Sequence, residues 1–256
     1  MTDLHVHLLA GLDDGPRTWD DALAMCRLMA AEGVTRSVAL AHQNDRWPLT
    51  PAAIRAAAAE LAARLAEAGV PLAVSPAAEV TATPDLADGW HAGRWLSVGD
   101  HGKYLLVEMP HALFVDLRPA VRQLSRTGVR VILAHPERHP ELLHDAGRVE
   151  ELIGLGCLVQ VSSASVTAPK SPADAAALKG WVRRGCVHLL GSDGHSPRGR
   201  KPHLAAAAAR VREWAGGAAA AAVCVGNGAT ILAGGVVAVE APRPARRWWP
   251  LRLTAR

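Results

Sequence analysis

Seven short apolar runs that alternate with helical patterns constrain the fold of this 256-residue chain more than any other feature. Each run is apolar and rich in β-branched residues, so we interpret it as a strand. The runs cover residues 4–8, 37–41, 72–75, 104–109, 129–134, 158–161 and 187–190. Strands that are apolar almost throughout belong to a parallel sheet with helices over both faces. We therefore expect an α/β protein whose sheet forms a closed or nearly closed barrel, with a doubly wound open sheet as the alternative.

Capping residues indicate where the helices between these strands begin and end. Thr18 precedes a helical pattern with an acidic residue three positions later, and Thr50 and Ser171 each precede a proline at the first helical position. Gly33 and Gly69 stand where the first two helices are expected to end. Further helices are expected over residues 117–127, 140–154 and 203–215.

The positive charge of the chain is concentrated at its C-terminus. The chain carries 28 Lys and Arg against 24 Asp and Glu, and five of the arginines lie within residues 241–256, which hold no acid. The remainder is close to neutral, so nucleic acid is not expected as a partner. We expect residues 1–240 to form the barrel and residues 241–256 to be a basic Pro/Trp/Arg tail that is poorly ordered. Contact of this tail with an anionic membrane surface or a protein partner is the alternative.

Residues 214–239 contain no charged side chain, a pattern that could indicate a membrane span. This stretch is mostly Ala and Gly and holds a turn signal at residues 226–228, so two short buried helices are expected instead of a span. The N-terminus lacks a basic region followed by an apolar one, and the four cysteines are widely spaced. We therefore expect a cytoplasmic protein without a signal peptide or a disulfide framework.

Imidazoles and carboxylates occur at or after almost every predicted strand. In parallel α/β barrels the carboxyl ends of the strands meet at one rim, where the chemistry is carried out. The residues at these ends are His5, His7, Asp13, Asp14, His42, Glu79, Glu108, His135, Asp193 and His195. Taken singly, each histidine could be a hydrogen-bonded core residue, and each carboxylate could pair with an arginine. Their coincidence at six strand ends favours one shared metal site.

Local spacing supports the same interpretation. His5 and His7 are two positions apart on a predicted strand, so both imidazoles lie on one face. Asp193 and His195 have the same spacing. Glu108 follows an apolar run, and a carboxylate buried there needs a cationic partner or a metal ion.

The donor set indicates which ions the site would hold. Imidazoles and carboxylates without a thiolate suit manganese, iron or zinc, and so many ligands indicate two or three ions with a bridging carboxylate. Several divalent ions would outweigh the carboxylate charge, attract a phosphate dianion and generate hydroxide from bound water. Arg138 and Arg200 lie on the expected rim loops and could bind phosphate oxygens in a bidentate manner.

Four motifs resemble those of the PHP (polymerase and histidinol phosphatase) superfamily. They are the segments 3–7, 11–15, 134–138 and 191–195, which read DLHVH, GLDDG, AHPER and GSDGH. The similarity extends to about residue 200 and is greatest to the bacterial capsule and exopolysaccharide manganese-dependent protein-tyrosine phosphatases. It implies a distorted, TIM-like barrel of the seven-stranded PHP type with a three-metal cluster.

The resemblance also assigns ligands by motif position. It implies that His5, His7, Glu79 and Asp193 bind one ion, that Glu79, Glu108 and His135 bind a second, and that Asp14, His42 and His195 bind a third. Whether Asp13 or Asp14 is the ligand is left open. By the same resemblance, Arg138 and Arg200 match phosphate-binding arginines.

The function that this resemblance implies is phosphomonoester hydrolysis, with a phosphotyrosine protein as substrate and Mn²⁺ as cofactor. A hydroxide bridging the metal ions would attack phosphorus, and a phenolate, whose acid has a pKa of about 10, would leave without a dedicated general acid. Regulation of capsule or exopolysaccharide synthesis, opposite a partner tyrosine kinase, is the expected setting.

Other functions remain as alternatives. A small-molecule phosphate monoesterase of the histidinol-phosphatase kind would use the same three-metal site. A metal amidohydrolase commonly has a carbamylated lysine near a strand end, whereas the lysines here lie elsewhere, at Lys103, Lys170, Lys179 and Lys201. A cysteine-dependent tyrosine phosphatase is excluded because no cysteine is followed six positions later by an arginine. A non-catalytic interaction module is the least favoured reading.

Overall fold

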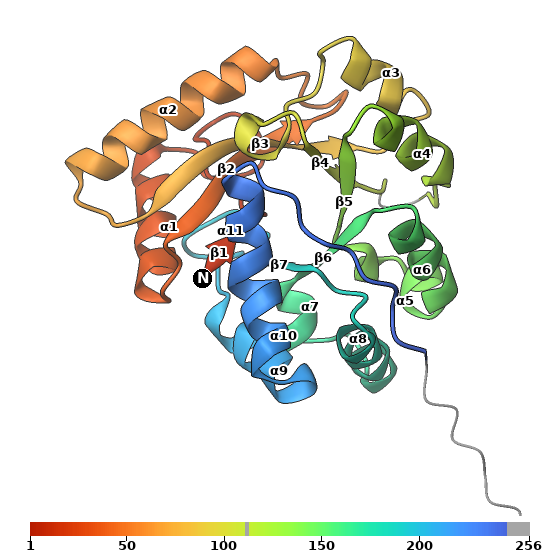
Figure 1. Cartoon of the computed structure of the whole chain (residues 1–256). Coiled ribbons are helices and arrows are strands. Elements are labelled where there is room, and N and C mark those ends of the chain that lie inside the picture. Colours follow the sequence, from red (N-terminus) through yellow and green to blue (C-terminus); the bar gives the residue numbers. More distant parts are fainter. Residues whose placement is uncertain (111–112, 245–256) are drawn as a thin grey trace, which may run out of the picture.

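Seven parallel strands form the centre of the molecule, as a computed structural model that describes residues 1–110 and 113–244 shows (Figure 1). They are β1 (Thr2–Asp3), β2 (Arg36–Gln43), β3 (Ala73–Thr81), β4 (Tyr104–Glu108), β5 (Arg130–Ala134), β6 (Leu158–Ser162) and β7 (Leu189–Gly191). The strands pair in sequence order from β1 to β7. A parallel bridge between Val6 and Gly194 connects the two edges of the sheet, so the barrel is nearly closed. The predicted barrel is confirmed.

Helices follow the strands around the outside of this barrel (Figure 1). They are α1 (Trp19–Ala31), α2 (Pro51–Glu67), α3 (Leu86–His91), α4 (Arg118–Arg126), α5 (Pro140–Leu143), α6 (Ala146–Gly154), α7 (Ser163–Thr167), α8 (Pro172–Arg184), α9 (Ala205–Ala215), α10 (Gly217–Ala221) and α11 (Asn227–Leu232). Three single turns, η1 (Val98–Asp100), η2 (Pro136–Arg138) and η3 (Ala222–Gly226), complete the set. The hydroxyls of Thr18, Thr50 and Ser171 each accept a hydrogen bond from the backbone three residues later, which confirms the predicted caps.

The first strand differs from the expectation of a strand over residues 4–8. Regular pairing with β2 is confined to Thr2 and Asp3, and single bridges follow at Val6 and His7. The backbone N–H of His5 donates to Oδ1 of Asp3, and the carbonyl of His5 accepts from Asp193 N at 2.7 Å. Because these groups are bonded elsewhere, the ladder with β2 is interrupted at His5.

The third strand is longer than predicted. It was expected to end before Pro76, but β3 continues to Thr81, and Pro76 lies beside Ala39 of β2. The missing N–H of Pro76 therefore does not end the pairing on this strand. As a result Glu79 lies inside β3 rather than in the loop after it.

Two helical predictions were also wrong in detail. The helix expected over residues 140–154 is divided into α5 and α6, because Asp145 (φ −120°, ψ 80°) leaves the helical region. Residues 226–228 do not form a turn: α10, η3 and α11 form one rod, and the chain turns instead at Gly216, whose φ is 88° (Figure 1). Gly228 is needed for packing, since a Cβ there would lie 2.8 Å from Cγ2 of Thr2.

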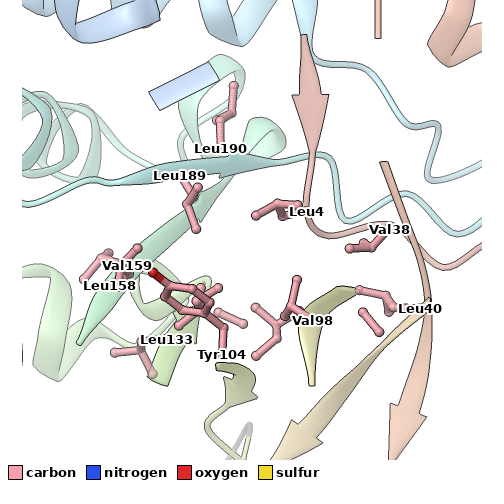
Figure 2. Close-up of a cluster of buried hydrophobic side chains, with 14 of the residues drawn as sticks. Leu4, Val38, Leu40, Val98, Tyr104, Leu133, Leu158, Val159, Leu189 and Leu190 are labelled. Atoms are coloured by element: carbon pink, nitrogen blue, oxygen red, sulfur yellow. The ribbon is translucent and has the colours of Figure 1, made fainter. Parts of the chain in front are cut away.

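The hydrophobic core fills the barrel below the rim. Leu4, Val38, Tyr104 and Leu189 are buried and point toward one another between the strands (Figure 2). The hydroxyl of Tyr104 accepts a hydrogen bond from the backbone N–H of Val237 at 3.0 Å, which fixes the segment after α11 to the barrel. The buried imidazoles and carboxylates at the carboxyl ends of the strands thus lie above a mostly apolar core.

The C-terminal segment lies mostly beyond the part of the chain that the structure describes. A poorly ordered tail is predicted over residues 241–256. Most of it, residues 245–256, lies outside the described residues. Arg243 is described, and its backbone N–H and carbonyl bond to the carbonyl and Nε of Arg184, each at 2.8 Å. Within residues 1–110 and 113–244, no helix is long and apolar enough to cross a bilayer, and all four cysteines are free and buried.

Candidate metal centre

Strand register brings the predicted residues to one mouth of the barrel. His42 of β2 lies directly beside Glu79 of β3, and Thr81 of β3 lies beside Glu108 at the end of β4. His135 and Asp193 come just after β5 and β7. Both adopt left-handed backbone conformations, with φ of 34° and 52°, which residues other than glycine rarely do. Such backbone strain is concentrated at functional sites, where the surrounding structure maintains it.

Glu79 is the centre of the cluster and is fully buried. Its Oε2 lies 3.1 Å from Nε2 of His5 and 3.3 Å from Nε2 of His7. Its Oε1 lies 3.0 Å from Nε2 of His135. One carboxylate thus contacts imidazoles from two different strand ends, those of the first strand and of β5.

A second set of side chains surrounds Asp14 at the outer edge of the mouth. Oδ1 of Asp14 lies 3.5 Å from Nε2 of His42 and 3.3 Å from Nε2 of His195. The ring of His195 is 3.8 Å from the ring of His7, so this set adjoins the Glu79 set. Asp14 is the most exposed of the predicted ligands, with 42% of its side chain accessible.

All nine predicted ligands fall into four overlapping groups whose donor atoms lie within 4.8 Å of one another. The groups are His7, Asp14, His42 and His195; His5, His7 and Asp193; His5, Glu79 and His135; and His42, Glu79 and Glu108. They overlap the three sets implied by the resemblance but are not identical to them. Glu108 is grouped with His42 and Glu79, whereas the resemblance placed it with His135.

The structure separates the positions of Asp13 and Asp14, which the sequence left open. Oδ2 of Asp13 lies 2.7 Å from Nδ1 of His7 and accepts from the backbone N–H of His42, and Oδ1 accepts from Gly15 N. Both oxygens of Asp13 are therefore already bonded. Asp13 bonds Nδ1 on the outer side of the His7 ring, whereas Asp14 faces Nε2 of His42 and of His195.

Two supporting residues were missed by sequence reasoning. Oε1 of Gln160, on β6, accepts from Nδ1 of His5 at 2.8 Å. Oγ1 of Thr81 donates to Oε1 of Glu108 at 2.8 Å. The only sequence signal for Gln160 was an amide in the middle of a predicted apolar strand, which a buried site requires to be hydrogen-bonded.

Arg138 and Arg200 also reach the mouth of the barrel. Both guanidinium groups donate to Oδ2 of Asp193, while Oδ1 of the same carboxylate lies 3.5 Å from Nε2 of His5. Arg138 is about three-quarters buried and Arg200 is half exposed. The two predicted arginines are thus adjacent to the cluster and to each other.

Electrostatic interactions within the cluster favour the charged forms of both His7 and Glu79. Burial lowers the pKa of His7, but the carboxylates of Asp13 and Glu79 raise it more, to about 10. Burial raises the pKa of Glu79, yet the neighbouring histidines His5, His135 and His7 lower it to well below its ordinary value. Glu79 is consequently an anion in a site that burial would otherwise keep neutral.

The hydrogen bonds at Nδ1 of His5 and of His7 orient the two rings so that Nε2 of each can bind a cation. Nδ1 of His7 is bonded to Asp13 and Nδ1 of His5 to Gln160, which turns Nε2 of each ring toward Glu79. Among the described residues, neither Nε2 has a hydrogen-bond partner. A carboxylate oxygen and a ring nitrogen at 3.1–3.3 Å need a positive charge between them, which the second ring proton supplies when no metal is bound. A divalent metal can replace that proton, because imidazole nitrogens and carboxylates are ligands that such metals bind.

Two clefts open from this cluster and share Asp14 as a wall. One, of about 470 Å³, extends over His42, Trp47 and Glu108. The other, of about 510 Å³, extends past His195 and Arg200. The cluster is therefore accessible from solvent on two sides.

Comparison with known proteins supports a family assignment. The family described as Capsular polysaccharide synthesis, CpsB/CapC, matches residues 1–233. Tyrosine-protein phosphatase YwqE of Bacillus subtilis is 30% identical over 212 residues, covering 79% of this chain and 80% of that protein. Tyrosine-protein phosphatase CpsB of Streptococcus pneumoniae is 26% identical over 214 residues, covering 80% of this chain and 86% of that protein.

Solved structures agree with this assignment. A crystal structure from work on YwqE of B. subtilis and CpsB of S. pneumoniae, described as unique metal-dependent tyrosine phosphatases, superimposes with a TM-score of 0.89 at 26% identity. It covers 96% of this chain and all of the other. A dihydropyrimidinase from Brevibacillus agri matches with a TM-score of 0.53 at 10% identity, which shows a similar barrel fold alone.

Proposed function

This chain belongs to the capsular polysaccharide synthesis family CpsB/CapC, and from that membership together with the geometry of its site we propose that it is a metal-dependent protein-tyrosine phosphatase. The observation that carries the proposal is the position of Glu79, whose Oε2 faces Nε2 of His5 and Nε2 of His7 beside two arginines. A metal cluster next to paired guanidinium groups is suited to bind and hydrolyse a phosphate ester.

We assign the metal-ligand role to the nine side chains at the mouth and propose Mn²⁺, in three ions, as the cofactor. Iron and zinc are the other ions that this donor set suits. Divalent ions held there supply positive charge and lower the pKa of bound water. The ligands are His5, His7, Asp14, His42, Glu79, Glu108, His135, Asp193 and His195.

The arginines have a separate task in this proposal. Oδ2 of Asp193 holds Arg138 and Arg200 at the edge of the cluster, and a guanidinium has further N–H groups that can donate to phosphate oxygens. Burial lowers the pKa of Arg138, but Asp193 raises it more, so the group stays charged. The two residues orient the phosphate and balance the negative charge that develops on it.

Tyrosine phosphate suits a site of this kind because of its leaving group. The pKa of a phenol is about 10, so the phenolate departs with little need for a proton donor. The relatives are tyrosine-protein phosphatases, and the family is one of capsular polysaccharide synthesis. We propose accordingly that the substrate is a phosphotyrosine protein of capsule or exopolysaccharide synthesis, phosphorylated by a partner tyrosine kinase in the cytoplasm.

The test compares metal states and substrates in one preparation. Protein stripped by a chelator and reloaded with Mn²⁺ is assayed with a phosphotyrosine peptide and with an alkyl phosphate. We expect activity to vanish on stripping, to return with Mn²⁺, and to favour the phosphotyrosine peptide. His135→Ala should abolish turnover without unfolding the chain. Turnover that survives exhaustive chelation would contradict the proposal, and a preference for alkyl phosphate would identify a small-molecule phosphate monoesterase instead.

A further inference from the structure

An aromatic side chain lies beside the metal centre and lines one of its two clefts. The indole of Trp47 stacks on the imidazole of His42, with ring centroids 4.8 Å apart and an angle of 11° between the planes. Trp47 is half-buried and lines the cleft of about 470 Å³ together with Asp14 and Glu108. A flat apolar wall therefore begins directly beside a proposed metal ligand.

The loop that carries Trp47 is held in place by a chain of hydrogen bonds. Oδ1 of Asn44 accepts from the backbone N–H groups of Arg46 and Trp47, each at 3.0 Å. Nδ2 of Asn44 donates to Oγ1 of Thr81 at 3.1 Å, and Thr81 in turn donates to Glu108. The loop that carries the indole is thus linked through Asn44 and Thr81 to the carboxylate of Glu108.

Other side chains in the cleft can also contact an aromatic ring of a substrate. Trp95 and Pro110 contribute apolar surface on the same cleft. The guanidinium of Arg46 lies 4.3 Å over one face of the indole of Trp47, and His42 stacks on the other. A substrate ring therefore meets Trp47 at the edge of the indole or displaces Arg46, whose side chain is exposed.

We infer that Trp47 is a specificity-determining residue that binds the aromatic ring of the substrate, an inference that rests on the proposed phosphatase function. With the phosphate at the metal cluster and the two arginines, the phenyl group points outward into the cleft that Trp47 lines. Contact between two aromatic rings stabilises binding beyond the area it buries, by an amount equivalent to about a tenfold gain in affinity. An alkyl phosphate has no ring to make this contact.

The experiment uses the full chain loaded with Mn²⁺ and three variants, Trp47→Leu, Trp47→Phe and Trp19→Leu. Trp19 is a half-buried indole on α1 that packs against Arg64 of α2 and does not line the cleft that Trp47 lines, so it provides the matched control. The measurements are kcat/KM for a phosphotyrosine peptide and for glycerol 2-phosphate, with the metal content of each protein.

We expect Trp47→Leu to lower kcat/KM for the phosphotyrosine peptide about tenfold, mainly through KM, and to leave the value for glycerol 2-phosphate within about twofold. Trp47→Phe should retain most of the selectivity, because it keeps a ring. Trp19→Leu should behave as the wild type. Equal losses on both substrates would overturn the inference and show that Trp47 only supports His42. An unchanged value for the peptide would overturn it as well.

A binding measurement separates this inference from the proposed function. The Kd values of phenylphosphonate and methylphosphonate, which are not hydrolysed, are compared by calorimetry for the wild type and Trp47→Leu. We expect the wild type to prefer phenylphosphonate and the variant to lose that preference. Failure of phosphatase activity in the wild type would remove the proposed function, whereas an unchanged ratio of the two Kd values would remove the ring contact. If Trp47→Leu only caused loss of metal, it would weaken the binding of both phosphonates equally. The ratio of their Kd values would then stay as in the wild type, which would count against the inference.

Discussion

Nδ1 of His5 lies 2.8 Å from Oε1 of Gln160, and this contact decides which nitrogen of the ring faces the cluster. The amide oxygen can only accept, so Nδ1 carries a proton, and in the neutral ring Nε2 is the nitrogen that has the lone pair for a metal ion. That lone pair points to Glu79. A residue on β6 thus sets the protonation of a proposed ligand on the first strand, as supporting hydrogen bonds do at metal sites in general.

Replacing Gln160 by Leu should weaken metal binding without removing a ligand. The ring of His5 would lose its hydrogen-bond acceptor and with it a fixed orientation, so we expect Mn²⁺ affinity to fall about 10- to 100-fold. Titration of stripped protein with Mn²⁺, followed by recovery of activity, measures the change. Gln123→Leu, at an exposed position of α4, is the control. Equal affinity in the two variants would show that Gln160 does not orient His5.

Asp13 and Asp14 are neighbours in sequence but should respond differently to the same substitution. Asp14→Asn removes a charge that faces His42 and His195, so we expect the loss of one bound ion per chain. Asp13→Asn disturbs the hydrogen bond to Nδ1 of His7, so the number of ions should be unchanged at saturating Mn²⁺ while the affinity falls about tenfold. Metal analysis of both variants after dialysis checks this difference. The reverse result would exchange the roles of the two residues.

Gly191 of β7 is required for the close approach of that strand to His5. A Cβ at this position would lie 2.6 Å from Cβ of His5 and 3.0 Å from the side chain of Gln160. Gly191→Ala should therefore displace His5, lower the free energy of unfolding by about 1–3 kcal/mol and abolish activity. Gly180→Ala, in α8 with open space around the new methyl group, should be neutral or stabilising. Urea unfolding and a phosphatase assay on both variants distinguish a steric effect from a general one.

Much of the fold follows from local patterns, because apolar strands and capping residues act over a few positions. Thr18, Thr50 and Ser171 cap helices as expected, since each cap needs only a hydroxyl and a backbone N–H three residues later. The course of the first strand was not predictable in this way. Its pairing is interrupted by bonds from His5 to Asp3 and to Asp193, and Asp193 is distant in sequence.

The residues of the candidate site were found from sequence for a related reason. Side chains at the carboxyl ends of parallel strands must converge, so type and position were enough to select them. The partners that orient them were not visible, because the contacts of Gln160 with His5 and of Thr81 with Glu108 depend on strand register. The stacking of Trp47 on His42 depends on a loop conformation set by Asn44. None of these contacts leaves a periodic signal in the sequence.

His188 gives the fold a pH dependence that is separate from the metal centre. This histidine precedes β7, is buried, and accepts a hydrogen bond at Nδ1 from the backbone N–H of Val159 at 3.0 Å. Burial, together with the charge of nearby Arg130, lowers its pKa to about 4. The folded state therefore holds the neutral ring at pH values where the unfolded chain, with a pKa of 6.5, already binds a proton.

His188 stabilises the folded state at neutral pH and contributes less as the pH falls. Between pH 6.5 and 4 the unfolded state binds more protons at this residue than the folded state, so the stability contributed by neutral His188 is complete above pH 6.5 and is lost as the pH falls toward 4. From pH 7.5 to pH 5 the loss from this residue amounts to about 2 kcal/mol. His188→Asn keeps an acceptor for Val159 but cannot titrate. Urea unfolding at the two pH values should show a smaller loss of stability in the variant than in the wild type, by about that amount. Because all other titrating groups are common to both proteins, an equal loss in the two would contradict the assignment of this pH dependence to His188.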